Sequence, residues 1–247
     1  MKIMVAPQKV GVGLDVNLAT IKERLPLVVG FTEMDLGPHS FVPKIIDTLG
    51  SSYTVVSDAA AGVHSQEIPV AIRTGPSTSV IRSQVIQISP DVGTKGTGND
   101  RYLAIVRFRH RDRTYVVMHT HTNAVIQSHK TLELLHNERA KVTAVAMQTI
   151  EDRAAAILAD TTVTALWIMG DFNYLPVQDP QIEWKHSPQQ TFARLGMRST
   201  HTRVIYLAWS KGVHRRGRVE VIGPGTTRNA SDHAFLVSGF RRAPGPP

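Results

Sequence analysis

Short runs of apolar, often β-branched residues recur along the chain, and clusters of Gly, Pro, Ser or Asp separate them. Runs of this kind, bounded by turn-forming residues, are typical of strands. The runs that predict strands are Leu27–Phe31, Tyr53–Ser57, Pro69–Arg73, Val80–Ile88, Tyr102–Phe108, Tyr115–Met118, Val163–Met169, Val204–Trp209, Val219–Ile222 and Ala234–Val237.

Other segments place apolar residues three and four positions apart, which predicts helices with one buried face. These segments are Asp15–Leu25, Ser40–Leu49, Lys130–Asp160 and, with a weaker pattern, Pro188–Leu195. We expect Asp15 to cap the first of them. The helices interrupt the strands without regular βαβ alternation, so the pattern predicts an α+β protein of layered sheets. We expect one domain over residues 1–242 and a disordered Pro-rich tail over residues 243–247.

The composition is that of a globular protein: 247 residues, 42% of them hydrophobic and 19% charged. No apolar run is long enough to cross a membrane, and the first residues lack the apolar core of a signal peptide. We therefore expect a cytoplasmic protein, and a bacterial or phage-encoded origin would suit such a chain. The absence of Cys excludes disulfides, thiolate metal sites and a Cys nucleophile.

The net charge of +8 is concentrated in one part of the chain. Residues Arg194–Arg242 include ten basic and two acidic side chains, and the rest of the chain is neutral overall. Part of this excess falls in a predicted basic loop, Gly212–Gly217. A local basic excess indicates an anionic partner, and nucleic acid is the usual one. The alternative is that these arginines only keep the surface soluble.

Four short strings place polar side chains at the end of an apolar run, where a rigid scaffold can present them. The strings are Val28–Glu33, Val116–Asn123, Trp167–Asn173 and Ser231–Val237. Each alone could be a turn, a surface charge or a buried histidine. Together their carboxylates, amide and imidazoles predict an oxygen-rich site for Mg²⁺ or Mn²⁺. Such a site beside a basic surface suits phosphodiester hydrolysis.

The order and spacing of these strings resemble the endonuclease/exonuclease/phosphatase superfamily, which contains deoxyribonuclease I and the exonuclease III-type enzymes. Gly170-Asp171-Phe172-Asn173 and Ser231-Asp232-His233 match its strings unchanged, and Phe31-Thr32-Glu33 is similar to its Gly-Leu-Gln-Glu. The resemblance implies a deoxyribonuclease I-like, four-layer α/β sandwich: two packed, mostly antiparallel sheets flanked by helices.

The resemblance also implies roles for single residues. Glu33, Asp232 and Asp171 would be the metal ligands, with Asp232 alternatively a partner of the catalytic histidine. Asp171 and Asn173 would also hold the scissile phosphate and the nucleophilic water. His233 would be the catalytic imidazole.

A second histidine of the site is ambiguous. The commoner form of the string selects His121, and the deoxyribonuclease I form selects His119. Residues 119 and 121 share one face of an extended strand, so both could line the site. Glu67 resembles the Glu that pairs with this histidine, although a solvated charge before a strand is an equal explanation.

The predicted function is a metal-dependent DNA endonuclease. We expect a group of arginines to hold the phosphate backbone: Arg73, Arg101, Arg203, Arg215, Arg216 and Arg228. An inositol phosphate or a phospholipid is an alternative substrate within the same superfamily.

Two positions depart from the superfamily pattern. The first strand normally carries an Asn, and none lies near Val5–Gln8, where Gln8 could substitute. The Asp that orients the catalytic His is replaced by Ile205. Because loss of such an Asp lowers turnover by orders of magnitude, a non-catalytic nucleic-acid-binding protein stays open as a second hypothesis.

Overall fold

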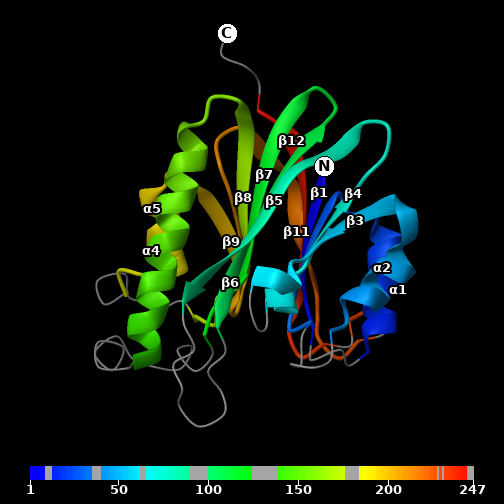
Figure 1. The fold of residues 1–247 in the computed structure, drawn as a ribbon, viewed down its shortest axis with the longest axis horizontal. Coiled ribbons are helices and arrows are strands. Elements are labelled where there is room, and N and C mark those ends of the chain that lie inside the picture. Colours follow the sequence, from blue (N-terminus) through cyan, green and yellow to red (C-terminus); the bar gives the residue numbers. More distant parts are fainter. Residues whose placement is uncertain are drawn as a thin grey trace.

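Two six-stranded sheets pack face to face, and helices cover the outer face of each (Figure 1). The structure, a computed structural model, describes residues 1–8, 13–34, 40–61, 65–89, 100–123, 138–175, 184–226, 228–229 and 231–243. This arrangement confirms the predicted four-layer α/β sandwich. Residues 244–247 of the predicted tail lie outside the described residues.

The two sheets have related topologies, each with one parallel pair of strands near its centre. The first sheet runs in the order β11 (Val213–Ile222), β12 (Phe235–Arg242), β1 (Lys2–Pro7), β2 (Val28–Thr32), β4 (Val70–Arg73), β3 (Tyr53–Val56). The second runs β5 (Thr78–Ser89), β6 (Arg101–His110), β7 (Arg113–His121), β8 (Val163–Asp171), β10 (Ile205–Trp209), β9 (Arg198–Thr202). The parallel pairs are β1–β2 and β7–β8, and the other pairs are antiparallel, as expected.

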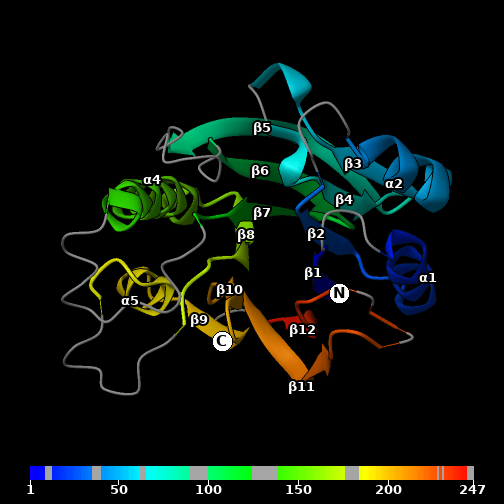
Figure 2. The same cartoon turned by 90° about the horizontal axis from the view of Figure 1, so that it is seen from below.

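Alternation along the strands divides the apolar residues among three layers of core, because successive side chains point to opposite faces. Val5, Val117 and Trp167 belong to the layer between the sheets. The helices α1 (Leu14–Arg24) and α2 (Val42–Leu49) pack on the first sheet, while α4 (Glu138–Ala159) and α5 (Pro188–Arg194) pack on the second (Figure 2). Single 3-10 turns lie at Gly50–Ser52, Ala59–Ala61 and Ser65–Glu67.

The predicted helices are confirmed where the structure describes them, with shifts at their starts. The residue that caps α1 is Gly13 rather than Asp15, which lies inside the first turn. The structure describes α4 only from Glu138, so the predicted helical segment 130–137 lies outside the described residues. Pro188 opens α5, where the missing N–H of proline is not needed, and Ser187 caps it.

Three strand predictions needed correction. Strand β1 was not among the predicted runs; it is buried from Ile3 to Pro7 and lacks the alternation that marks a half-exposed strand. Strand β9 is polar and largely exposed, and forms by pairing with β10. Strand β11 begins at Val213, so the predicted basic loop over 212–217 is mostly strand.

No helix in the described parts of the chain is both long enough and apolar enough to cross a membrane.

Candidate active site

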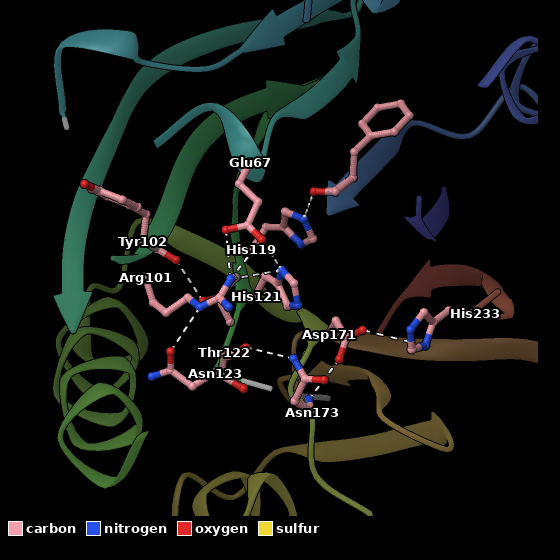
Figure 3. Close-up of polar contacts among 12 residues, drawn as sticks. Glu67, Arg101, Tyr102, His119, His121, Thr122, Asn123, Asp171, Asn173 and His233 are labelled. Atoms are coloured by element: carbon pink, nitrogen blue, oxygen red, sulfur yellow. Dashed lines mark hydrogen bonds and ion pairs between the residues drawn. The ribbon is translucent and has the colours of Figure 1, made fainter. Parts of the chain in front are cut away.

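The two parallel strand pairs bring the polar strings to one end of the sandwich. Pro7 on β1 pairs with Thr32 on β2, and His121 on β7 pairs with Asp171 on β8. Paired parallel strands end at the same edge of their sheet. The two sheets meet at this edge, where the carbonyl oxygen of Phe31 on β2 lies 2.6 Å from Nε2 of His119 on β7. The loop before β12 enters the same region (Figure 3).

Asp171 and Asn173 form the rigid centre of this end. The Asp171 side chain is buried, and its Oδ1 accepts a hydrogen bond from the backbone N–H of Asn173 (2.9 Å). The Asn173 side-chain amide donates to the carbonyl of Thr122 (2.8 Å). Asn173 has a φ of 49°, a left-handed conformation that Asn tolerates better than most residues. These contacts fix both side chains without any ligand.

Gly170 is required for the approach of β7 to β8. Its φ is 152°, and a Cβ at this position would lie 1.9 Å from the carbonyl oxygen of Thr120. Any side chain would force the two strands apart just before Asp171. The glycine of the Gly-Asp-Phe-Asn string is therefore explained by backbone geometry.

His233 faces two carboxylates. Its Nδ1 lies 3.8 Å from Oδ2 of Asp171, and its Nε2 lies 3.8 Å from Oδ1 of Asp232. The His233 side chain is 28% exposed, whereas that of Asp171 is 1% exposed, so the imidazole lies at the mouth of the site. The sequence did not single out Asn229, which accepts from the N–H of Ser231 and donates to the carbonyl of His233. A turn-forming Asn two residues before the string was its only signal.

Glu67 and His121 form a buried ion pair that Arg101 completes. The Nδ1–H of His121 donates to Oε1 of Glu67 (2.5 Å), and Nη1 of Arg101 donates to both carboxylate oxygens (2.8 and 2.9 Å). Arg101 Nε donates to Oδ1 of Asn123 (3.2 Å). The structure thus brings Glu67 to His121, as the resemblance implied, and places Arg101 inside the site rather than on its surface.

The charges of this trio are set by burial and by one another. Burial disfavours the Glu67 carboxylate, but the neighbouring His121 and Arg101 outweigh it and lower the pKa of Glu67 to about 2. Burial also opposes the His121 imidazolium, yet the Glu67 carboxylate raises the pKa of His121 above its usual value. His121 is therefore held in its protonated, positively charged form.

His119 lies deeper, between the sheets. It is fully buried, with Nε2 2.6 Å from the carbonyl oxygen of Phe31 and Nδ1 3.1 Å from that of Met169. A Cβ on Gly30 would lie 2.6 Å from Nδ1, so the glycine makes room for the ring. Burial lowers the pKa of His119 to about 4. Residues 119 and 121 share a face, but only His121 reaches the carboxylates.

Glu33 directly follows β2 and has a left-handed φ of 60°. Burial raises the pKa of Glu33, and the nearby Asp171 and Asp232 raise it further, against the effect of His121 and His233. This coupling places Glu33 in the same electrostatic environment as the other predicted metal ligands.

The residues present fit a hydrated Mg²⁺ or Mn²⁺. In the described residues, no three His, Asp or Glu side chains are grouped so as to enclose a metal ion. Mg²⁺ does not need such an enclosure, because proteins usually hold it with one or two carboxylates plus waters and substrate phosphate. Asp171 and Asp232 disfavour the negative charge of Glu33, and a divalent cation would relieve that repulsion.

The structure accounts for both departures from the superfamily pattern. The Gln8 side chain is fully buried; it donates to the carbonyl of Ala6 (2.9 Å) and accepts from Asn17 (2.5 Å), so its amide is engaged away from substrate. Ile205 is buried in the core between the sheets. The carboxylates that face His233 are instead Asp171 and Asp232.

The predicted substrate arginines divide between the two ends of the sandwich. Arg203 and Arg228 are exposed at the site end, next to the strand β10 start and the Asn229 turn. Arg101 also lies at the site end, bound to Glu67. The remaining three lie at the far end: Arg73 pairs with Tyr53, Arg216 with Gly239, and Arg215 with Phe240. This corrects the expectation of one basic surface beside the site, because antiparallel pairing carries these residues to the opposite edge.

Solved structures share this architecture across nearly the whole chain. An endonuclease/exonuclease/phosphatase from Bacteroides vulgatus aligns with a TM-score of 0.68 and 12% identity, covering 98% of each chain. The 2′,3′-cyclic phosphatase ANGEL2 aligns at 0.67 and 13%, covering 98% of this chain and 95% of its own. The human Nocturnin catalytic domain aligns at 0.65 and 15%, covering 98% and 94%. The chain has the endonuclease/exonuclease/phosphatase fold. No protein-family model and no curated protein sequence matches it.

Within this fold, the site occupies one end of the sandwich, where both sheets contribute. The first sheet supplies Glu33 and His233, and the second supplies His121, Asp171 and Asn173. The result is an acidic centre with a half-exposed imidazole on one side and a charged, buried imidazole on the other. Such a site can position an anionic ester, accept a proton and donate one.

Proposed function

We propose that the chain is a divalent-metal-dependent phosphodiesterase that acts on nucleic acid, with DNA as its first expected substrate. The observation that carries the proposal is the approach of His233 to the buried Asp171, 3.8 Å from Nδ1 to Oδ2, beside Glu33. A base next to a fixed carboxylate is what activation of water requires.

The chain's own residues can supply each step of the hydrolysis. His233 would accept the proton of the attacking water, and Asp171 would orient and stabilise the resulting imidazolium. Asn173 would hold a phosphate oxygen or the water. His121, kept charged by Glu67, would stabilise the phosphate or protonate the leaving oxygen. A bound Mg²⁺ or Mn²⁺, held by Glu33 with Asp171 or Asp232, would neutralise charge on the phosphate.

Two exposed arginines at the site end support a polymeric substrate. Arg203 and Arg228 are exposed at the site end, where a phosphate next to the scissile one would lie. Proteins of this fold include one named as a mannosyl-6-phosphatase and one named as a 2′,3′-cyclic phosphatase. Smaller phosphate esters are therefore the comparison substrates in the experiment below.

Nicking of supercoiled plasmid tests the proposal. The protein is assayed with Mg²⁺, with Mn²⁺ and with EDTA, alongside Asp171→Asn and the control Asp47→Asn on the exposed face of α2. We expect metal-dependent nicking that Asp171→Asn abolishes and Asp47→Asn leaves unchanged. Hydrolysis of RNA or of a small phosphate ester without nicking would reassign the substrate.

Binding of plasmid without hydrolysis of any ester, in either metal, would overturn the enzymatic proposal. It would favour the nucleic-acid-binding hypothesis, which the engaged Gln8 amide and the apolar Ile205 motivate.

A further inference from the structure

A basic groove lies at the end of the sandwich opposite the candidate active site. It has a volume of about 370 Å³ and forms where the β6–β7 hairpin of one sheet meets β11 and β12 of the other. Its floor includes the buried rings of Tyr115 and Phe240. The two sheets therefore build this groove jointly, as they build the active site.

Five guanidinium groups line the groove, and one carboxylate opposes them. The lining arginines are Arg111, Arg113, Arg216, Arg241 and Arg242, and the carboxylate is Asp112. Asp112 pairs with Arg113 (3.1 Å), and within the described residues no carboxylate pairs with the other four. Four unopposed guanidiniums at one opening produce a strongly positive local potential.

The amine of Met1 responds to this potential. It lies in the groove and donates to the carbonyl of Phe240 (2.8 Å). Burial lowers the pKa of the amine, and the neighbouring Arg111 and Arg216 lower it further.

We propose that this groove binds the phosphate backbone of a nucleic acid, as a second contact separate from the active site. Guanidinium groups match phosphate oxygens with paired N–H donors, as they match carboxylates, so it is the extent of the charge that favours a polymer of phosphates. The positive charge also continues out of the groove along the edge strand β11, through the exposed Arg215 and Arg218. A single phosphate would not need that continuation, whereas a polymer would use it.

The spacing of the two sites sets the length of nucleic acid that can reach both. Arg113 and His121 lie at opposite ends of β7, which spans roughly 25 Å. A straight duplex covers that distance in about seven base pairs. The inference rests on the proposed nucleic-acid substrate. It adds that the substrate backbone beyond the scissile phosphate binds in this groove.

Duplex binding without catalysis tests the groove. The affinity of a labelled 30-base-pair duplex is measured by fluorescence anisotropy in EDTA over a range of salt. The groove variant is Arg241→Glu/Arg242→Glu. The matched control is Arg82→Glu/Arg153→Glu, whose exposed arginines lie on β5 and α4, outside the groove. Thermal midpoints establish that both variants are folded.

We expect the groove variant to bind at least tenfold more weakly and the control to change less than threefold. The slope of the logarithm of the binding constant against the logarithm of the salt concentration should become shallower by roughly two in the groove variant, the value for two lost phosphate contacts. Equal weakening in both variants, or none in the groove variant, would overturn the proposal. So would binding of polyglutamate as tight as that of duplex, which would mark a general polyanion site.

Hydrolysis of bis(p-nitrophenyl) phosphate separates this inference from the proposed function. If no metal supports hydrolysis but duplex binding depends on the groove, the catalytic proposal fails and the groove assignment stands. If hydrolysis is intact in the groove variant and duplex affinity is also unchanged, the groove assignment fails and the catalytic proposal stands.

Discussion

His121 directs its Nδ1 atom at the Glu67 carboxylate, 2.5 Å from Oε1, and both side chains are buried. Arg101 binds the same carboxylate with a single nitrogen, Nη1, which lies 3.3 Å from Nδ1 of His121. The three charges thus depend on one another: the carboxylate stays ionised because two cations face it, and His121 stays charged because the carboxylate faces it.

Removal of one member of this trio should destabilise the protein more than removal of two. Glu67→Gln leaves the Arg101 guanidinium buried without a counter-charge, which is expected to cost about 3–5 kcal/mol of unfolding free energy. Glu67→Gln/Arg101→Met should recover a substantial part of that loss, because no unpaired buried charge remains. Denaturant unfolding of both single variants and the double variant measures the coupling. Strict additivity of the two single changes would contradict the interdependence.

His233 should be open to rescue by a diffusible base. Its side chain is partly exposed at the mouth of the site, so His233→Ala creates a space that imidazole can enter. We expect turnover of a small phosphodiester to fall about 10²- to 10⁴-fold, as for other general bases, and to recover in part with added imidazole. His214→Ala, on β11 at the opposite end, is the control. A loss without rescue would indicate that the imidazole only packs or orients.

The strings that mark the active site were readable from the sequence because each lies directly before or after a strand. Asp171 and Asn173 are fixed by contacts within a few residues and by the neighbouring β7, so local pattern and site geometry agree. The Glu67–Arg101 ion pair was not readable: the two residues lie 34 positions apart and meet only through the fold. The basic segment shows the same limit. Arg215 and Arg216 lie close to the Ser231-Asp232-His233 string in the sequence, but the fold places them at the opposite end of the sandwich.

Because His119 is buried, the folded protein should become less stable in mild acid. Burial lowers the pKa of His119 to about 4 in the folded protein, whereas an unfolded histidine titrates near 6.5. Between those values the unfolded state binds more protons, so stability is full above pH 6.5 and falls as the pH drops to 4. The difference corresponds to roughly 3 kcal/mol. His119→Gln should flatten the unfolding free energy over this range relative to the wild type, and an unchanged slope would contradict the assignment.

Gly170 should tolerate no side chain. The Cβ of Gly170→Ala would lie 1.9 Å from the Thr120 oxygen, so the strands must separate or the variant must unfold, at a cost of roughly 3 kcal/mol or more. Gly225→Ala is the matched control: its φ is 65°, but nothing lies within 4 Å. Its strain alone should cost about 1–2 kcal/mol. Similar unfolding free energies for the two variants would show that steric contact with β7 is unimportant.

Glu33→Gln should raise the stability of the fold without metal and lower it, relative to the wild type, when metal is bound. Without metal, the pKa of Glu33 is raised by burial and by Asp171 and Asp232, so its charge is unfavourable and a neutral amide should stabilise the fold. With metal, the wild type should gain about 2.7 kcal/mol at a free Mg²⁺ or Mn²⁺ concentration 100 times the dissociation constant, and the variant should gain much less. Thermal unfolding in EDTA and across a metal titration measures both effects. Glu23→Gln, on an exposed part of α1, should show neither. If Glu33→Gln keeps the full metal-dependent shift, the cation lies elsewhere, and Glu33 acts only through its charge.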